Sequence, residues 1–295
     1  MKHKNVLALA GLMAAVPLSF PALAANGHYV PGLEGIGGPV VPPPGVYYRS
    51  YLVHYDIDNL RDGQGNKAPG KNTGVVTALA NRFVWITGKK FLGADYGAEL
   101  IVPLQDTSLK FRGLGVTDSD SGVGDVFVGP VVLGWHGQQW DAVFAAGHWF
   151  DTASYEPTEP ASIGKGYGTT MLTLGGTWHF DPDKRWSFSA LSRYEIKTKQ
   201  DDTDVTPGDS WLVEWALSHR LANGLDVGLV GYEAWQLERD KGSSSDKAEK
   251  HALGAEVGYF WPHLGLGLNG AYYQEYNNKA GPEGDLFRLT LTKAF

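Results

Sequence analysis

The sequence contains no cysteine, and beyond its first two dozen residues it has no apolar run long enough to form a membrane-spanning helix. Without cysteine there is no disulfide framework and no cysteine to carry a lipid anchor. A spanning helix needs about 18 or more consecutive apolar residues. These absences exclude a disulfide-stapled domain, a lipoprotein and a helical membrane protein.

The amino terminus is the only part of the chain that is both basic and strongly apolar. Lys2 and Lys4 precede an apolar run that ends near Phe20, and the triplet Ala-Leu-Ala at 22–24 matches a small-x-small cleavage site. This order is typical of a secretory signal. We therefore expect a signal peptide over residues 1–24 and an exported mature chain, in the periplasm or outer membrane of a bacterium.

Positive charge is scarce in the rest of the chain. The sequence has 25 Lys and Arg against 32 Asp and Glu, a formal net charge of -7, and losing Lys2 and Lys4 would make it -9 (-7 minus 2). Nucleic acid is thus not an expected partner. We find no metal triad, phosphate loop or nucleophile motif, and expect no cofactor and no metal. The acidic stretches at 118–120 and 201–204 are interpreted as solvated loops rather than cation sites.

What the sequence does contain is alternation of period two. In residues 186–197, WSFSALSRYEIK, large apolar residues such as Trp186 and Phe188 share one face, while Arg193 and Glu195 share the other. A transmembrane β-barrel alternates lipid-facing and lumen-facing residues in this way. A soluble sandwich also alternates, but it would not usually place large aromatics at the ends of nearly every segment.

Twelve alternating segments follow residue 44, and the connections between them alternate between long polar loops and short turns. The segments are 45–57, 73–88, 90–106, 122–136, 139–152, 167–180, 186–199, 209–221, 225–239, 249–261, 264–277 and 285–295. Outer-membrane barrels have an even number of strands, short periplasmic turns and longer extracellular loops. The sequence therefore predicts one all-β domain over residues 45–295, an antiparallel transmembrane β-barrel of about 12 strands in the outer membrane.

The last segment, GDLFRLTLTKAF, is amphipathic and ends on an aromatic residue. It must pair with the first strand, because an unpaired edge in lipid leaves backbone groups unsatisfied. We expect outer-membrane lipid to contact its odd-numbered row. A terminal aromatic resembles the signal that barrel-assembly machinery reads, so this machinery is an expected partner through Phe295.

Residues 25–44 are not strand-like, because they are rich in glycine and proline and carry few charges. One interpretation is a disordered periplasmic leader. The other is a plug in the periplasmic half of the lumen that packs on Phe127 and Val131, since several of its residues are apolar. The plug candidates are Tyr29, Leu33 and Ile36.

Strand parity also predicts which side chains face the lumen. The candidates are Arg82, Asp95, Glu99, Asp125, Phe127, Val131, Asp141, Arg193, Glu195, Glu214, Glu256, Glu275 and Arg288. Buried charges persist only when paired, so these form either a bracing salt-bridge network or a constriction that orients a permeant. Segments 123–135 and 139–150 are apolar on both faces, which predicts a partly hydrophobic lumen. Asn81 and Glu233 fall on the lipid face, which suggests a bulge or a misassigned strand.

Several stretches in order resemble the meta-pathway phenol-degradation family of outer-membrane proteins. They are HYVPG (28–32), VVPPPGVYYRSYLVHYD (40–56), GVGDVFVGPVVLGW (122–135), YEIKTKQDDTDVTPGDSWLVEW (194–215) and GLDVGLVGYEAWQLERD (224–240). The resemblance implies a barrel that passes aromatic or other hydrophobic compounds. Residues 146–157 depart from the family pattern, so that loop can differ in shape.

Three functions remain open at this stage. The first is passive uptake of small hydrophobic or aromatic compounds, and the second is a channel for small polar solutes such as nucleosides or acidic sugars. The third is a lipid-active barrel enzyme, but His148 and Ser154 do not match the His-x-Ser pattern of the outer-membrane phospholipase. We therefore expect a channel with a small-molecule permeant and no catalytic residues.

Overall fold

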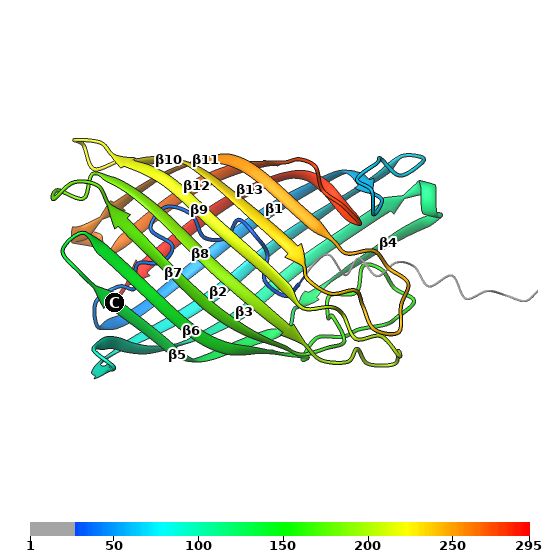
Figure 1. The fold of residues 1–295 in the computed structure, drawn as a ribbon, viewed down its shortest axis with the longest axis horizontal. Coiled ribbons are helices and arrows are strands. Elements are labelled where there is room, and N and C mark those ends of the chain that lie inside the picture. The colour runs from blue at the N-terminus through cyan, green and yellow to red at the C-terminus, as the bar shows by residue number, and fades with distance from the viewer. Residues whose placement is uncertain (1–26) are drawn as a thin grey trace, which may run out of the picture.

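A computed structural model describes residues 27–295, so the expected signal peptide lies outside the described residues. Thirteen antiparallel strands form one sheet (Figure 1). They are β1 (Gly45–Arg61), β2 (Asn72–Phe91), β3 (Ala94–Phe111), β4 (Val116–Val123), β5 (Val126–His136), β6 (Trp140–Phe150), β7 (Thr169–His179), β8 (Trp186–Lys197), β9 (Ser210–Arg220), β10 (Asp226–Gln236), β11 (Glu249–Trp261), β12 (Leu266–Glu275) and β13 (Gly281–Ala294). Within these residues, no helix is both long and apolar enough to cross a membrane.

The sheet closes on itself because β1 pairs with β2 along one edge and with β13 along the other. Strands β4 and β5 both pair with β3, β4 along Leu104–Phe111 and β5 along Asp95–Ile101. They are therefore two halves of one barrel strand, interrupted at Gly124 and Asp125. Counting them as one leaves twelve positions (13 minus 1), which confirms the predicted twelve-stranded closed barrel.

Alternation decides which side chains face outward. In β13 Phe287 is 46% exposed, whereas the neighbouring Arg288 is only 1% exposed. Large aromatics are exposed on most strands, among them Trp85, Trp140, Trp178, Trp186, Trp211 and Tyr272. Aromatic girdles around an apolar band are typical of outer-membrane barrels. The outer surface therefore suits lipid, and the polar rows lie inside.

Two predicted boundaries were wrong. The expected loop at 107–121 is instead a hairpin, because β3 continues to Phe111 and turns through a short 3-10 helix, η1 (Arg112–Leu114), into β4. The expected turn at residues 88–89 lies further on, at Leu92 and Gly93, whose φ angles of 51° and 78° are left-handed. Both stretches hold residues that are depleted in strands, Asp118 and Asp120 in β4 and Gly88 in β2, so their composition predicted connections where the strands continue.

Neither polar exception on the lipid face reflects a bulge or a misassigned strand. Strand β10 pairs with β9 and β11 without a register shift, and Glu233 contacts His251 of β11. Asn81 accepts a 2.7 Å hydrogen bond from the Tyr48 hydroxyl and donates one of 3.1 Å to the carbonyl of Val102. Both outward polar groups are satisfied by neighbouring strands, which is how they are retained there.

The connections predict the orientation of the barrel. At one end of the barrel the connections are long, among them 62–71, 151–168, 198–209 and 237–248, and at the other end they are short, as at 221–225. Because outer-membrane barrels have longer extracellular loops, we call the long connections the outer loops. Cysteines at Ser119 and Ser244 should react with an impermeant maleimide on intact cells, and a cysteine at Asn223 should react only after permeabilisation. Labelling of the Asn223→Cys variant on sealed cells would contradict this orientation.

Candidate functional site

Residues 27–44, called the N-terminal segment, run inside the barrel (Figure 1). Four of its backbone amides donate hydrogen bonds to wall carboxylates. Tyr29 N donates to Glu195 (3.1 Å), Gly32 N and Glu34 N donate to Glu214 (2.8 and 3.0 Å), and Ile36 N donates to Glu256 (3.1 Å). A non-strand backbone has no ladder partner, so its buried polar groups need side-chain partners. The wall carboxylates supply them.

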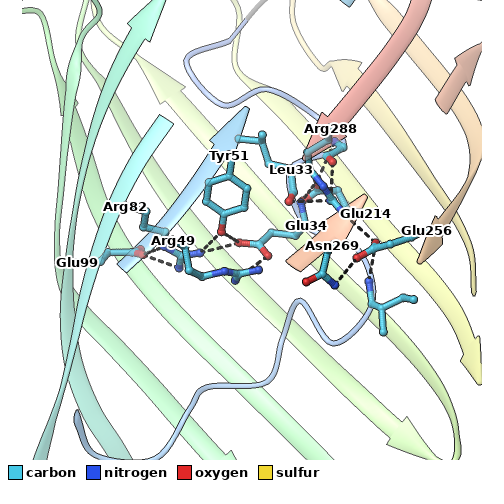
Figure 2. Close-up of polar contacts among 12 residues, drawn as sticks. Leu33, Glu34, Arg49, Tyr51, Arg82, Glu99, Glu214, Glu256, Asn269 and Arg288 are labelled. Atoms are coloured by element: carbon cyan, nitrogen blue, oxygen red, sulfur yellow. Dashed lines mark hydrogen bonds and ion pairs between the residues drawn. The ribbon is translucent and has the colours of Figure 1, made fainter. Parts of the chain in front are cut away.

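Arg288 donates hydrogen bonds to backbone carbonyls of the same segment (Figure 2). Its Nη1 atom donates 2.8 Å hydrogen bonds to the carbonyls of Gly32 and Leu33. Its Nη2 atom lies 2.9 Å from Glu256. The last strand of the barrel thus binds the N-terminal segment. In the Arg288–Glu256 ion pair, the arginine donates to backbone carbonyls of the segment and the carboxylate accepts from a backbone amide.

The centre of the lumen holds a carboxylate of the N-terminal segment, Glu34, which is 4% exposed (Figure 2). Its oxygens lie 3.1 Å from Arg49 Nη1 and 2.6 Å from Arg82 Nη1, and one accepts a 3.0 Å hydrogen bond from the Tyr51 hydroxyl. Arg82 also binds Glu99 at 2.5 Å. A buried carboxylate persists only when paired and hydrogen-bonded, and every partner of Glu34 here belongs to the wall.

A second charged group holds Tyr29. The Arg193 guanidinium lies 3.8 Å from the centroid of the Tyr29 ring, a cation–π geometry. Arg193 Nη1 is 2.5 Å from Glu214, and the Tyr29 hydroxyl donates to the same carboxylate at 2.8 Å. Glu214 therefore joins a wall arginine to the segment's side chain as well as to its backbone.

The outer end of the segment reaches beyond the periplasmic half that the sequence suggested. His28 Nε2 lies 3.0 Å from Asp125, and Nδ1 lies 2.8 Å from the hydroxyl of Thr169, the first residue of β7. Its ring stacks on Trp149 with centroids 5.6 Å apart. Asp125 also accepts backbone hydrogen bonds from Thr152 and other loop residues. The break between β4 and β5 is thus tied to both the segment and the outer loop.

Acidic side chains gather in the outer loops beside this contact. Burial, together with the neighbouring carboxylates of Asp201 and Asp125, raises the pKa of Asp151 to about 6. Like charges at short range disfavour the ionised form. The outer mouth therefore becomes more negative as the pH rises through that value.

A cavity of about 570 Å³ lies between the N-terminal segment and a wall formed by β1, β2, β3 and β5 to β8, with Phe260 of β11 and Thr292 and Ala294 of β13 also in its lining. One part of its lining is apolar and comes from Val41, Val84, Ile86, Val132, Val143 and Leu191. The other part is charged and comes from Arg49, Arg82, Glu99 and Arg193. The cavity is therefore amphipathic, with an apolar region beside a cluster of guanidinium groups.

The structure brings many of the predicted lumen residues together. Arg82, Glu99, Asp125, Arg193, Tyr29 and Leu33 line the cavity, and Glu195, Glu214, Glu256 and Arg288 bind the N-terminal segment. Phe127 packs on Trp149 in one cluster with Tyr29 and Leu33. Ile36 packs instead against a separate cluster that contains Tyr232 and Tyr273.

Three predicted residues lie apart from the segment. Glu275 accepts hydrogen bonds from the hydroxyls of Tyr55 (2.6 Å) and Tyr232 (2.7 Å). Asp95 and Asp141 belong to a cluster at the turn end of the barrel, where His136 lies 2.7 Å from Asp141 and 3.6 Å from Asp95. These groups brace the wall away from the cavity.

The placement of Val131 corrects the sequence-based expectation. The β5–β6 register shifts between Val128 and Val131, and Val132 rather than Val131 lines the cavity. A bulge adds one residue to a strand and reverses the parity beyond it. Pro130, which has no backbone donor, lies inside this interval.

Sequence reasoning missed Glu34, Arg49 and Tyr51. Glu34 is the only acidic residue of the N-terminal segment, and a lone charge among glycine, proline and apolar residues was a usable signal. Arg49 and Tyr51 share the inward parity of Val53 on β1. Among residues 27–295, no group of three or more His, Asp or Glu side chains is arranged to hold a metal ion.

Glu214 gives a direct test of this arrangement. Changing Glu214→Ala leaves Arg193 buried without its carboxylate, and losing one partner of a buried pair costs about 3–5 kcal/mol. We expect a lower urea midpoint for unfolding of the purified barrel in detergent. Asp226→Ala is the matched control, because its partner Arg220 is exposed, and an exposed pair contributes about 1 kcal/mol or less. Equal shifts in the two variants would contradict the assigned role.

The comparisons with known proteins agree with this geometry. The family model described as "Putative MetA-pathway of phenol degradation" matches residues 57–291. An outer membrane channel from Pseudomonas putida F1 has a TM-score of 0.78 at 13% identity, covering 87% of this chain and 97% of that chain. The translocator domain of the autotransporter NalP from Neisseria meningitidis has a TM-score of 0.53 at 11% identity, covering 86% of this chain and 90% of that chain. No curated protein matches.

At these identities the likeness shows the fold alone, which is that of bacterial outer-membrane barrels. The outward aromatic residues and closed ladder are those of a protein located in the outer membrane. The family match covers well over half of the chain. The chain belongs to the MetA-pathway phenol-degradation family.

Proposed function

We propose that this protein is an outer-membrane channel for passive uptake of small hydrophobic or aromatic compounds. The observation that carries the proposal is the cavity of about 570 Å³ with an apolar region built from valine, isoleucine and leucine. Ligand sites for small molecules are mostly apolar with a few placed polar groups. The family description, which refers to phenol degradation, also supports an aromatic permeant.

The alternative is a channel for small polar solutes. An aqueous pore of that kind would present free charges to the permeant, whereas the central charges here bind one another or the N-terminal segment. The apolar side of the cavity offers a sugar or nucleoside few hydrogen-bond partners. A catalytic role is not part of the proposal.

The N-terminal segment is proposed to act as a plug that narrows the path. It is supported by its contacts, since Glu195, Glu214, Glu256 and Arg288 all bind its backbone. A twelve-stranded barrel is wide enough to leak water unless its lumen is filled. Permeants would then pass beside the segment, through the cavity.

Recognition by barrel-assembly machinery is also proposed for the end of β13. The backbone amide of Phe295 donates a 3.0 Å hydrogen bond to Val46 of β1, so this residue lies at the closing seam. The residue is 78% exposed. An exposed aromatic at the seam is available to another protein until lipid covers it.

Uptake of a labelled neutral aromatic compound tests the channel. Cells that carry the protein in the outer membrane should accumulate the compound faster at low concentration than cells that lack it, because the cavity offers an apolar path. A labelled nucleoside serves as the comparison compound. Faster uptake of the nucleoside with unchanged uptake of the aromatic compound would favour the polar-solute channel instead.

Deleting residues 27–39 tests the plug. The folded barrel should persist, because β1 begins only at Gly45, and single-channel conductance in planar bilayers should rise as the lumen empties. Deletion of residues 242–245, in an outer loop, is the control and should leave the conductance close to that of the intact protein. Equal conductance of the intact chain and the first deletion would show that the segment does not restrict the pore.

A further inference from the structure

The Glu34 carboxylate occupies a site that the barrel wall provides. Its oxygens bind Arg49 and Arg82, accept from the Tyr51 hydroxyl, and lie 4.0 Å from Arg193. These partners come from β1, β2 and β8, and none comes from the N-terminal segment itself. Paired guanidinium groups with a hydroxyl donor are what carboxylate recognition requires. The wall therefore holds a carboxylate site whether or not Glu34 fills it.

The ion pairs of the central arginines show that one of them takes its carboxylate from the N-terminal segment. Four central arginines of the wall are paired as follows: Arg82 with Glu99, Arg193 with Glu214, Arg288 with Glu256, and Arg49 with Glu34. The first three carboxylates belong to strands, whereas the fourth belongs to the N-terminal segment. Without Glu34, Arg49 is the one of these four arginines that loses its paired carboxylate. An unpaired charge in a buried setting is costly.

Arg49 is the member of the site that a permeant can reach. Its side chain is 29% exposed and lines the cavity. Its Nη1 atom binds Glu34 at 3.1 Å, and its Nε atom is buried without a hydrogen-bond partner. Arg82, by contrast, is shared between Glu34 and Glu99, and its side chain is only 18% exposed. An incoming acceptor would therefore meet the Arg49 side chain first.

The apolar region of the cavity lies next to this site. Val84 and Ile86 follow Arg82 on the inward face of β2, and all three line the cavity. An apolar protein cavity of about 150 Å³ is enough to bind benzene, so about 570 Å³ accommodates an aromatic ring with substituents. A molecule with a ring and one carboxylate would match both parts of the lining.

We propose that Arg49, Arg82 and Tyr51 form the carboxylate-binding site of the channel, that Glu34 occupies it when no permeant is bound, and that the permeants include small aromatic or apolar monocarboxylic acids. This inference rests on the proposed uptake function and names its substrate class. The permeant's carboxylate takes the place of Glu34, so the charge of the cluster stays balanced during the exchange. Loss of the Glu34 contacts also loosens the centre of the N-terminal segment beside the cavity.

The test compares benzoate with benzamide, which has a similar size but no charge at pH 7. Full-length protein and its variants are reconstituted in liposomes, and initial uptake of each labelled compound is measured below saturation. Arg49→Gln should reduce benzoate uptake about tenfold, since charge-assisted hydrogen bonds are strong, and should change benzamide uptake little. Glu34→Gln removes the internal competitor and should increase benzoate uptake, again with little change for benzamide.

Arg61→Gln is the matched control, because it breaks the Arg61–Glu283 pair, which lies outside the cavity lining. Liposomes with the Arg61→Gln variant should take up both compounds at the same rate as liposomes with the unsubstituted protein. Heat-modifiable migration on a gel establishes that each variant is folded. Glu34 lies outside the strands, so the Glu34→Gln variant tests the site even where an arginine variant fails to fold.

The outcomes separate the two proposals. Equal loss of benzoate and benzamide uptake in Arg49→Gln, or unchanged benzoate uptake in Glu34→Gln, would overturn the carboxylate site while leaving the hydrophobic channel intact. Uptake of neither compound above protein-free liposomes would overturn the channel itself and the carboxylate site with it.

Discussion

The pairing of β1 with β13 is the constraint on which the rest of the structure depends. Backbone groups have no water to bind in the hydrocarbon region, so a sheet that spans it must close. Closure pairs strands whose residues are more than 200 positions apart in the sequence, as where His54 of β1 pairs with Phe287 of β13. It also fixes the parity of every strand, so that one row meets lipid and the other encloses a lumen. The cavity and its charged lining exist only because the ring is complete.

Inside the barrel, side chains provide the hydrogen-bond partners that the backbone of the N-terminal segment needs. The N-terminal segment has no strand partner, and its amides and carbonyls bind wall residues such as Glu214 and Arg288. The charges that hold it also neutralise one another, since each central arginine has a carboxylate within 3.1 Å. Each central arginine is therefore paired through its terminal nitrogens, although the Nε atoms of Arg49, Arg193 and Arg288 have no hydrogen-bond partner. The apolar part of the cavity lies on the same inward face, further along β2, where Val84 and Ile86 follow Arg82.

Much of the fold could be predicted from sequence, because alternation and loop lengths are local signals that the barrel enforces on every strand. The twelve positions, the closing strand and the inward parity of residues such as Arg193 followed from that pattern. The bulge before Val131 could not be predicted from it, since one added residue leaves the apolar composition unchanged. The contact of Glu34 with Arg49 was also out of reach, because it depends on how an irregular segment threads the lumen, which no periodicity encodes.

The binding of Gly32 by Arg288 has a consequence for the order of assembly. The segment's partners lie on the first strands, on the middle strands and on the last strand, and the contact with Arg288 spans 256 positions of the chain. No partial sheet presents all of these partners at once. The segment is synthesised before the barrel strands, but it can make all of its contacts only after β13 has paired with β1. A fully bound segment therefore indicates a closed barrel. Contacts of such sequence separation form late, because loop closure must come first.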